Sequence, residues 1–289
     1  MSKILLSNMT NMKVIKDWLT KKVKNTTAKK DGRDVIKLVP HRSVGGVNLP
    51  GYEISQEWEV YLENAGIYDL ALCHDVTDIA AQQKTFHYLD AEGKKRSYTP
   101  DLIFTVNNTR IVCEVKPLRY LLEKETREYL SILHRVLTRE GYQFHFLTED
   151  QLLNKPRCKN VKKIIRYKSH HLSQEIITSY RNLVIDKTIT VKDLLEHVPT
   201  KYGLANIYAA IMKGFLCIDW DVKVGLDSEI YLPTTERRSL TYEQVSTSGR
   251  YGPILQRLVL EGGSEAERIL AIKKSEGKQI TNYNPLGFF

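Results

Sequence analysis

The segment from Tyr98 to Pro117 constrains the fold more than any other part of the chain. Two arms rich in Val, Ile, Leu and Phe flank the polar pair Asn107–Asn108. This pattern predicts an antiparallel β-hairpin with a two-residue turn. If the two asparagines form the turn, Asp101 on the first arm lies directly opposite Glu114 on the second.

Two carboxylates that face each other across a β-ladder repel and destabilise the pair. A cation resting between Asp101 and Glu114 would remove that repulsion. Lys116 follows Glu114 by two positions and therefore shares its face, because side chains alternate along a strand. The hairpin thus predicts that two acids and one lysine converge at its end.

This set of groups indicates metal-assisted phosphodiester hydrolysis. Carboxylate oxygens suit Mg²⁺, with Mn²⁺ as a substitute, and the ion retains waters and accepts a phosphate oxygen. A nearby ammonium orients the water or offsets charge on the phosphate. Pro100–Asp101 followed by Glu114-Val115-Lys116 resembles the PD-(D/E)XK nuclease signature. The alternative interpretation, a surface hairpin with a charged face, leaves the opposed acids unexplained.

A third carboxylate is expected from a helix that precedes the hairpin. Ser55–Trp58 fits a helix N-cap with an acidic first turn, and a buried stripe follows, broken around Gly66. Glu59 and Glu63 are four residues apart and would share a helical face. Glu63 is the preferred third acid, and Glu59 is its main rival.

The remaining pattern completes an α/β fold. Short strands are expected at 76–81 and 85–89, with a charged turn at 91–96. An amphipathic helix is expected over 119–140, ended by Gly141, and a strand over 142–147. These elements predict a mixed sheet flanked by helices.

The net charge of +9 is unevenly distributed. Residues 1–50 carry 11 Lys and Arg against 3 acids, and residues 151–171 carry 7 against none. Residues 51–150 between them carry 11 against 17. We therefore expect a basic N-terminal arm over 1–50 and a basic connector over 151–171, both suited to double-stranded DNA. For 26–50, DNA contact and a simple tether remain open alternatives.

The order of these motifs resembles the TnsA family, which supplies one endonuclease subunit of heteromeric transposases. The resemblance covers about residues 55–150, and more loosely 172–235. Its motifs are Glu63, Val76–Ile79 leading to Gln82, Tyr98–Asp101, Glu114–Pro117 and Phe144–Asp150. The step from Glu63 to Val76 matches that family, which favours Glu63 over Glu59. Family members carry Glu or Gln at the position of Glu114.

The resemblance implies a restriction-endonuclease-like nuclease domain over 51–150. It implies Mg²⁺ held by Glu63, Asp101 and Glu114, with Val115 in the ligand set, and Lys116 assisting the hydrolytic water. TnsA-like proteins cut the 5′ transposon ends, on the non-transferred strand, while a TnsB-type transposase cuts and joins the 3′ ends. A TnsC-type ATPase regulator contacts the C-terminal region.

A second, winged-helix-like α+β domain is expected over 172–235. Helices are expected at 172–182, at 190–198 with Thr190 as N-cap, and at 202–212, followed by strands at 215–219 and 228–232. The third helix is nearly uncharged, so protein docking is favoured over base readout. Residues 236–289 predict a partly flexible tail that folds against a partner. Its apolar end, Leu286–Phe289, either docks on a partner or packs on its own domain.

The cysteines and the hydropathy exclude several classes of protein. The four cysteines are far apart and have no paired spacing, which disfavours a zinc site or a disulfide framework. His170 and His171 have no acid or cysteine nearby in sequence and are interpreted as non-ligands. No apolar run approaches the roughly 20 residues of a membrane span, so a cytoplasmic protein without a membrane partner is expected.

Two other functions remain open. One is a different PD-(D/E)XK nuclease, such as a restriction enzyme or a junction resolvase, which would cut without a transposase. The other is a winged-helix DNA-binding regulator with an inactive nuclease-like hairpin.

Overall fold

The computed structural model describes residues 45–47, 49, 56–58, 61–90, 92–185, 187–198, 201, 203–233 and 240–276. Most of the predicted basic arm, the proposed N-cap Ser55, the rival acid Glu59 and the apolar end Leu286–Phe289 lie outside these residues.

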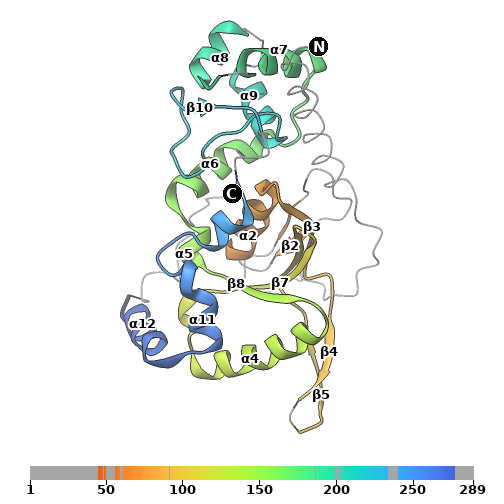
Figure 1. Cartoon of the computed structure of the whole chain (residues 1–289), viewed down its shortest axis with the longest axis vertical. Coiled ribbons are helices and arrows are strands. Elements are labelled where there is room, and N and C mark those ends of the chain that lie inside the picture. The colour runs from red at the N-terminus through yellow and green to blue at the C-terminus, as the bar shows by residue number, and fades with distance from the viewer. Residues whose placement is uncertain are drawn as a thin grey trace, which may run out of the picture.

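The central sheet has four strands in the order β3-β6-β7-β8 (Figure 1). The strands are β3 (Val76–Ala81), β6 (Leu102–Val106), β7 (Thr109–Val115) and β8 (Gln143–Leu147). The first three are antiparallel, whereas β8 runs parallel to β7. The predicted mixed sheet is confirmed, and it forms a restriction-endonuclease-like α/β core with its flanking helices.

The β6–β7 hairpin has the predicted register. Its pairs run from Leu102 opposite Cys113 to Val106 opposite Thr109. Asn107 and Asn108 have φ angles of 47° and 70°, which a two-residue hairpin turn of type I′ requires at both central positions. Asp101 immediately precedes β6, and this register carries it opposite Glu114.

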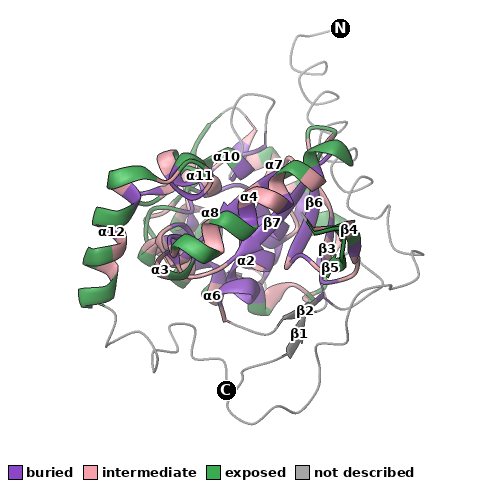
Figure 2. Cartoon of the chain, turned by 90° about the horizontal axis from the view of Figure 1, so that it is seen from below, coloured by how far each residue is buried: buried purple, intermediate pink, exposed green. Residues whose placement is uncertain are grey.

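Helices cover both faces of the sheet. On one face α2 (Tyr61–Leu72) contributes Ile67 and Leu70 to a core that contains Leu102 and Cys113. On the other face α3 (Leu118–Leu121) and α4 (Lys124–Arg139) pack over Ile103 and Val112. The amphipathic pattern of α4 buries a stripe of leucines, namely Leu130, Leu133 and Leu137. In Figure 2 the buried β7 lies among these helices.

Two helix predictions need correction. The expected break of the buried stripe around Gly66 does not occur, because Gly66 is itself buried where α2 lies close to the sheet. A Cβ at position 66 would lie 3.4 Å from the Cδ1 of Leu102, so the glycine permits this close packing. The helix expected over 119–140 is instead two helices, separated at 122–123. Gly141 follows them with φ of 79°, as expected.

The segment 56–58 is a strand, not the first turn of a helix. β2 (Gln56–Trp58) pairs with β1 (Gly45–Val47). Gln56 is fully buried, and its Oε1 accepts a 2.9 Å hydrogen bond from the backbone N–H of Ala81. A buried backbone N–H needs such a partner, and this contact from β3 was not visible in the local pattern.

A separate hairpin joins β4 (Phe86–Leu89) to β5 (Lys95–Tyr98). The predicted charged turn therefore ends before Lys95, and its last two residues belong to β5. The hairpin projects from the body of the molecule (Figure 1).

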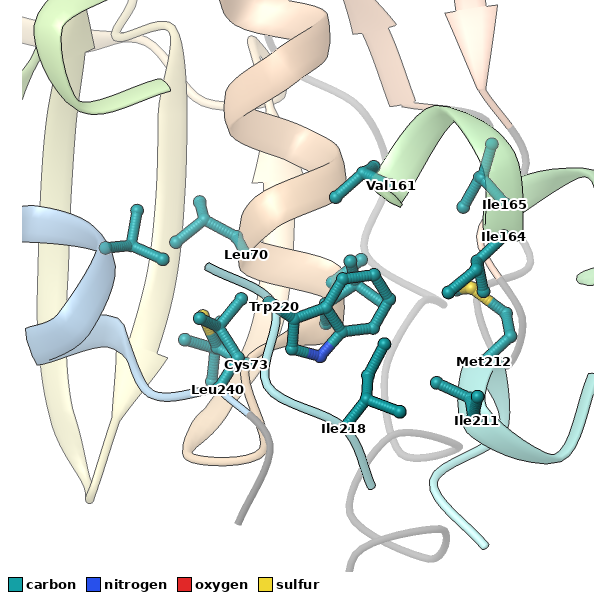
Figure 3. Close-up of a cluster of buried hydrophobic side chains, with 14 of the residues drawn as sticks. Leu70, Cys73, Val161, Ile164, Ile165, Ile211, Met212, Ile218, Trp220 and Leu240 are labelled. Atoms are coloured by element: carbon teal, nitrogen blue, oxygen red, sulfur yellow. The ribbon is translucent and has the colours of Figure 1, made fainter. Parts of the chain in front are cut away.

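The predicted basic connector contains helices that pack into the core. They are α5 (Glu149–Leu152), α6 (Lys155–Ile164) and the 3₁₀ helix η1 (Ile165–Tyr167). Figure 3 shows Val161, Ile164 and Ile165 beside Trp220 and Leu70. The apolar side of the basic segment thus joins the central α/β core to the following region.

Residues 172–233 contain the three predicted helices. They are α7 (Gln174–Val184), α8 (Val191–His197) and α9 (Gly203–Met212), and Thr190 caps α8 as predicted. β9 (Ile189–Thr190) pairs with β10 (Glu229–Ile230). The strand expected at 215–219 is wrong: Cys217 makes one isolated bridge to Tyr231. Residues 216–218 are all buried, unlike the alternating side chains of a half-buried strand. The winged-helix assignment stays a prediction.

Residues 240–276 form helices against the central α/β core. They are α10 (Tyr242–Ser246), η2 (Gly252–Ile254), α11 (Leu255–Leu260) and α12 (Gly263–Glu276). Leu255, Leu258 and Val259 are buried with residues of α4 and β8. The partial flexibility expected for 236–289 stays a prediction. Across the described residues, no helix combines the length and apolar character needed to span a membrane.

Candidate active site

The β6–β7 hairpin brings Asp101, Glu114 and Lys116 together. The Nζ of Lys116 lies 2.8 Å from the Oε1 of Glu114, so these two side chains share one face, as predicted. The Oδ2 of Asp101 accepts a 2.8 Å hydrogen bond from the backbone N–H of Val115. Val115 thus fixes the first acid beside the strand that carries the second acid and the lysine.

Tyr98 adds a contact that the sequence analysis did not assign. Its hydroxyl donates a 2.7 Å hydrogen bond to the Oε2 of Glu114, while the other oxygen of Glu114 holds Lys116. Burial raises the pKa of Tyr98 well above its usual value, and repulsion from Glu114 and Asp101 adds to that shift. The hydroxyl therefore remains a donor. The only sequence signal was that Tyr98 closely precedes Pro100–Asp101.

Glu63 approaches from the first turn of α2. It is 5% exposed, and its Oε2 accepts a 3.0 Å hydrogen bond from the Nε2 of Gln82. The backbone N–H of Gln82 donates to the carbonyl oxygen of Asp101 at 3.1 Å. Gln82 thereby links the third acid to the hairpin. It has φ of 50° and follows the irregular part of β3 between Thr77 and Ala80.

The neighbouring acids act on the electrostatics of Asp101. Burial raises the pKa of Asp101 well above its usual value, and repulsion from Glu114 and Glu63 raises it further. The Val115 N–H and Lys116 act in the opposite direction. For Lys116, burial lowers the pKa, but attraction and hydrogen bonding to Glu114 outweigh burial, so the net shift is upward. Two buried acids, Glu63 and Glu114, and the partly buried Asp101 therefore lie near one ammonium.

Comparison with known families supports the same segment. Residues 73–149 match the family model of the TnsA-like endonuclease N-terminal domain. The chain carries a TnsA-like endonuclease domain. Asp101, Glu114 and Lys116 fall inside the matched residues, whereas Glu63 lies just before them. A comparison with curated proteins gives no match.

The acids of the TnsA-like domain fit a hard divalent cation by their chemistry. All of the candidate ligand side chains are carboxylates, and their mutual repulsion is the type of strain that a bound cation relieves. Among the described residues, only the Oδ2 of Asp101 accepts a hydrogen bond, which leaves its Oδ1 as an acceptor for an ion. In that same part of the chain, no His, Cys, Asp and Glu side chains form a ready-made set of three or more ligands. Glu63 and Glu114 instead bond to Gln82, Tyr98 and Lys116.

Proposed function

We propose that this chain is a metal-dependent DNA endonuclease that cleaves the 5′ ends of a transposon, on the non-transferred strand, during cut-and-paste transposition. The convergence of Asp101, Glu114 and Lys116 inside the segment that matches the TnsA-like model supports this proposal. The coarser conclusion, a nuclease domain of transposition, rests on the family match itself.

The side chains have distinct roles in this proposal. Glu63, Asp101 and Glu114, with Val115 completing the set, would hold Mg²⁺ or Mn²⁺. A bound ion of this kind polarises a phosphoryl oxygen and acidifies a water. Lys116, held by Glu114 at 2.8 Å, would orient the attacking water and offset charge that builds on the phosphate.

Two supports would keep these groups in place. The Tyr98 hydroxyl fixes one oxygen of Glu114, so that the carboxylate does not rotate freely. Gln82 holds Glu63 and contacts the backbone of Asp101, which couples the helix to the hairpin. Such supporting hydrogen bonds orient ligands and keep a site close to its productive geometry.

Partners follow from the same proposal. A TnsB-type transposase would cut and join the 3′ ends, and a TnsC-type ATPase would dock on the C-terminal region, including 172–235. The nearly uncharged α9 argues against base readout there, since its residues 206–212 are buried and offer no basic face to DNA. Transposon-end duplex DNA would meet the basic segments, and the protein would act in the cytoplasm.

The decisive experiment maps strand breaks on end-labelled transposon-end DNA. The protein is incubated with Mg²⁺ or Mn²⁺, with and without the partner transposase, alongside Asp101→Ala. Breaks at the 5′ ends that need the partner and disappear in the variant support the proposal. Breaks without the partner identify another PD-(D/E)XK nuclease. DNA binding that Asp101→Ala leaves unchanged, without any metal-dependent break, identifies a non-catalytic regulator.

A further inference from the structure

The β4–β5 hairpin projects from the body of the molecule (Figure 1), and its tip is exposed. It leaves the body of the molecule near the candidate active site and ends in an isolated turn (Figure 1). Leu89 at the end of β4 is 62% exposed, and residues 92–97 are all exposed. A two-stranded hairpin alone is at best marginally stable in water, so a projecting one is suited to packing against a partner.

The two faces of the hairpin differ. Phe86 and Tyr98 form a cross-strand pair and belong to the core, and Tyr88 packs against that core from the next position on the same face. The opposite face carries His87 paired with Ser97 and Leu89 paired with Lys95. All four of these side chains are exposed. The hairpin is therefore anchored by one face and presents the other to solvent.

The turn of the hairpin is preorganised and basic. Asp90 accepts hydrogen bonds from the backbone N–H groups of Glu92 and Lys94 and from the Nε of Arg96. Lys94 approaches Glu92 at only 4.0 Å, with both side chains 70% exposed, and such a pair contributes little. Lys95 lies beside them on the exposed strand. The tip thus carries three cations, Lys94, Lys95 and Arg96, and two acids, Asp90 and Glu92. The rest of the domain is acidic.

The base of the hairpin reaches the candidate catalytic acids. Tyr98, the last residue of β5, donates its hydroxyl to Glu114, and Thr85 and Thr99 share a 2.8 Å hydrogen bond across the base. A ligand held by the tip would consequently be aligned with respect to the site. The major groove of B-DNA admits a two-stranded β-ribbon, and exposed lysines on such a ribbon bind phosphates.

We propose that the β4–β5 hairpin is a DNA-binding arm, which grips the duplex flanking the scissile phosphate through Lys94 and Lys95. This inference rests on the proposed nuclease function, because it assigns the duplex substrate of that site to a particular surface. The basic tip favours DNA over a protein partner, because phosphate contact requires only exposed cations of this kind.

The test measures DNA binding without cleavage. Fluorescence anisotropy follows a labelled transposon-end duplex with full-length Asp101→Asn protein across a series of salt concentrations. The added double change is Lys94→Ala with Lys95→Ala, which leaves the Asp90–Arg96 contact intact. We expect weaker binding and a slope of log K against log salt that is smaller by about 2, since each phosphate contact contributes roughly 0.9.

The matched control removes two exposed cations from α12, by Arg268→Ala with Lys274→Ala. In Figure 1 this helix lies on the other side of the molecule from the hairpin. We expect the control to keep the parental slope. Equal slopes for the two double variants would overturn the proposal, as would failure of the parent to bind DNA.

A change confined to partner-stimulated cleavage, with DNA affinity and slope unchanged, would assign the hairpin to the transposase and also overturn the proposal. Failure of the proposed function is a separate outcome. If the wild-type protein binds DNA through the hairpin but produces no metal-dependent break, the proposed nuclease function is contradicted. The proposed DNA-binding role of the hairpin is then still supported.

Discussion

Two buried charged clusters in this protein have opposite electrostatic designs. Around Arg157, which is fully buried, the Nε lies 2.9 Å from the Oδ2 of Asp69, and the guanidinium also donates to the Gln151 carbonyl and the Ser248 hydroxyl. Burial raises the pKa of Asp69 to about 6, while the adjacent Arg157 opposes that shift. Around Asp101, the nearest carboxylates add to the effect of burial.

The difference separates a structural charge from a candidate functional one. The guanidinium of Arg157 joins α2, the end of α5 and the segment that follows α10, and its hydrogen bonds are satisfied within the protein. The Asp101 cluster has more acids than cations, so its carboxylates repel one another. Proteins retain unfavourable interactions of this kind mainly at functional sites, where a ligand relieves them. The following predictions test this contrast.

The largest expected effect is on cleavage. Asp101→Ala should reduce metal-dependent cleavage by on the order of 10³-fold or more, since a metal ion contributes several kcal/mol to such reactions. Its melting temperature should change little, because relief of the repulsion and loss of the hydrogen bond from the Val115 N–H act in opposite directions. Single-turnover cleavage and thermal unfolding measure the two effects. Retained cleavage would refute the catalytic assignment of this acid.

The next effect is on stability. Arg157→Ala leaves Asp69 buried without its cation, and breaking a buried pair in this way costs roughly 3–5 kcal/mol. Urea unfolding with Arg166→Ala as the control measures this cost, since Arg166 is exposed on the adjacent η1. Equal stabilities for the two variants would show that Arg157 is no more structural than a surface residue.

A smaller effect concerns pH. The raised pKa of Asp101 means that the unfolded chain loses this proton first, so the carboxyl destabilises the fold increasingly as pH rises above about 4. Asp101→Asn removes that penalty, keeps an acceptor for Val115, and should raise the melting temperature of metal-free protein by a few degrees at pH 8.

The difference between the two proteins should shrink at pH 5, and added Mg²⁺ should stabilise the wild type more than the Asn variant. Thermal scans at both pH values, with and without the ion, provide the measurement. A variant that is less stable than wild type at pH 8 would show that the carboxylate is needed by the fold itself.

The smallest effect concerns the support of Glu114. Tyr98→Phe removes a hydrogen bond to a carboxylate but keeps the ring in the core, so roughly tenfold slower cleavage is expected with a stability loss of about 1 kcal/mol. Tyr88→Phe is the control on the same face of the hairpin. Equal cleavage rates for the two variants would remove Tyr98 from the site.

The local sequence predicted the hairpin better than it predicted the helix beside it. Asn107–Asn108 fixed the turn, and the turn fixed the register that places Asp101 against Glu114. The strand at Gln56–Trp58 resembled a helix start because Glu57 and the preceding Ser55 fit a capped helix equally well. The pairing of β2 with β1 and the long-range contact of Gln56 with Ala81 distinguish the two.

Tertiary packing also determined the structure of the C-terminal region. The short apolar patches around Leu255 and Leu258 are too brief to predict their partner, and they proved to cover α4 and β8. The site's supporting residues, Tyr98 and Gln82, escaped prediction for a related reason. Their roles depend on side-chain contacts between elements that are distant in the chain, and a local sequence pattern does not predict such contacts.

By itself the sequence determined the hairpin, its register and the chemistry of two acids beside a lysine, because turn type and alternation are local properties of the backbone. The tertiary structure alone decided that Glu63 joins the hairpin acids through Gln82, and that the basic segment at 151–171 buries one arginine in the core. Those outcomes depend on burial. A buried charge costs free energy unless a hydrogen-bonding or oppositely charged group lies beside it, and here distant segments of the chain provide those groups.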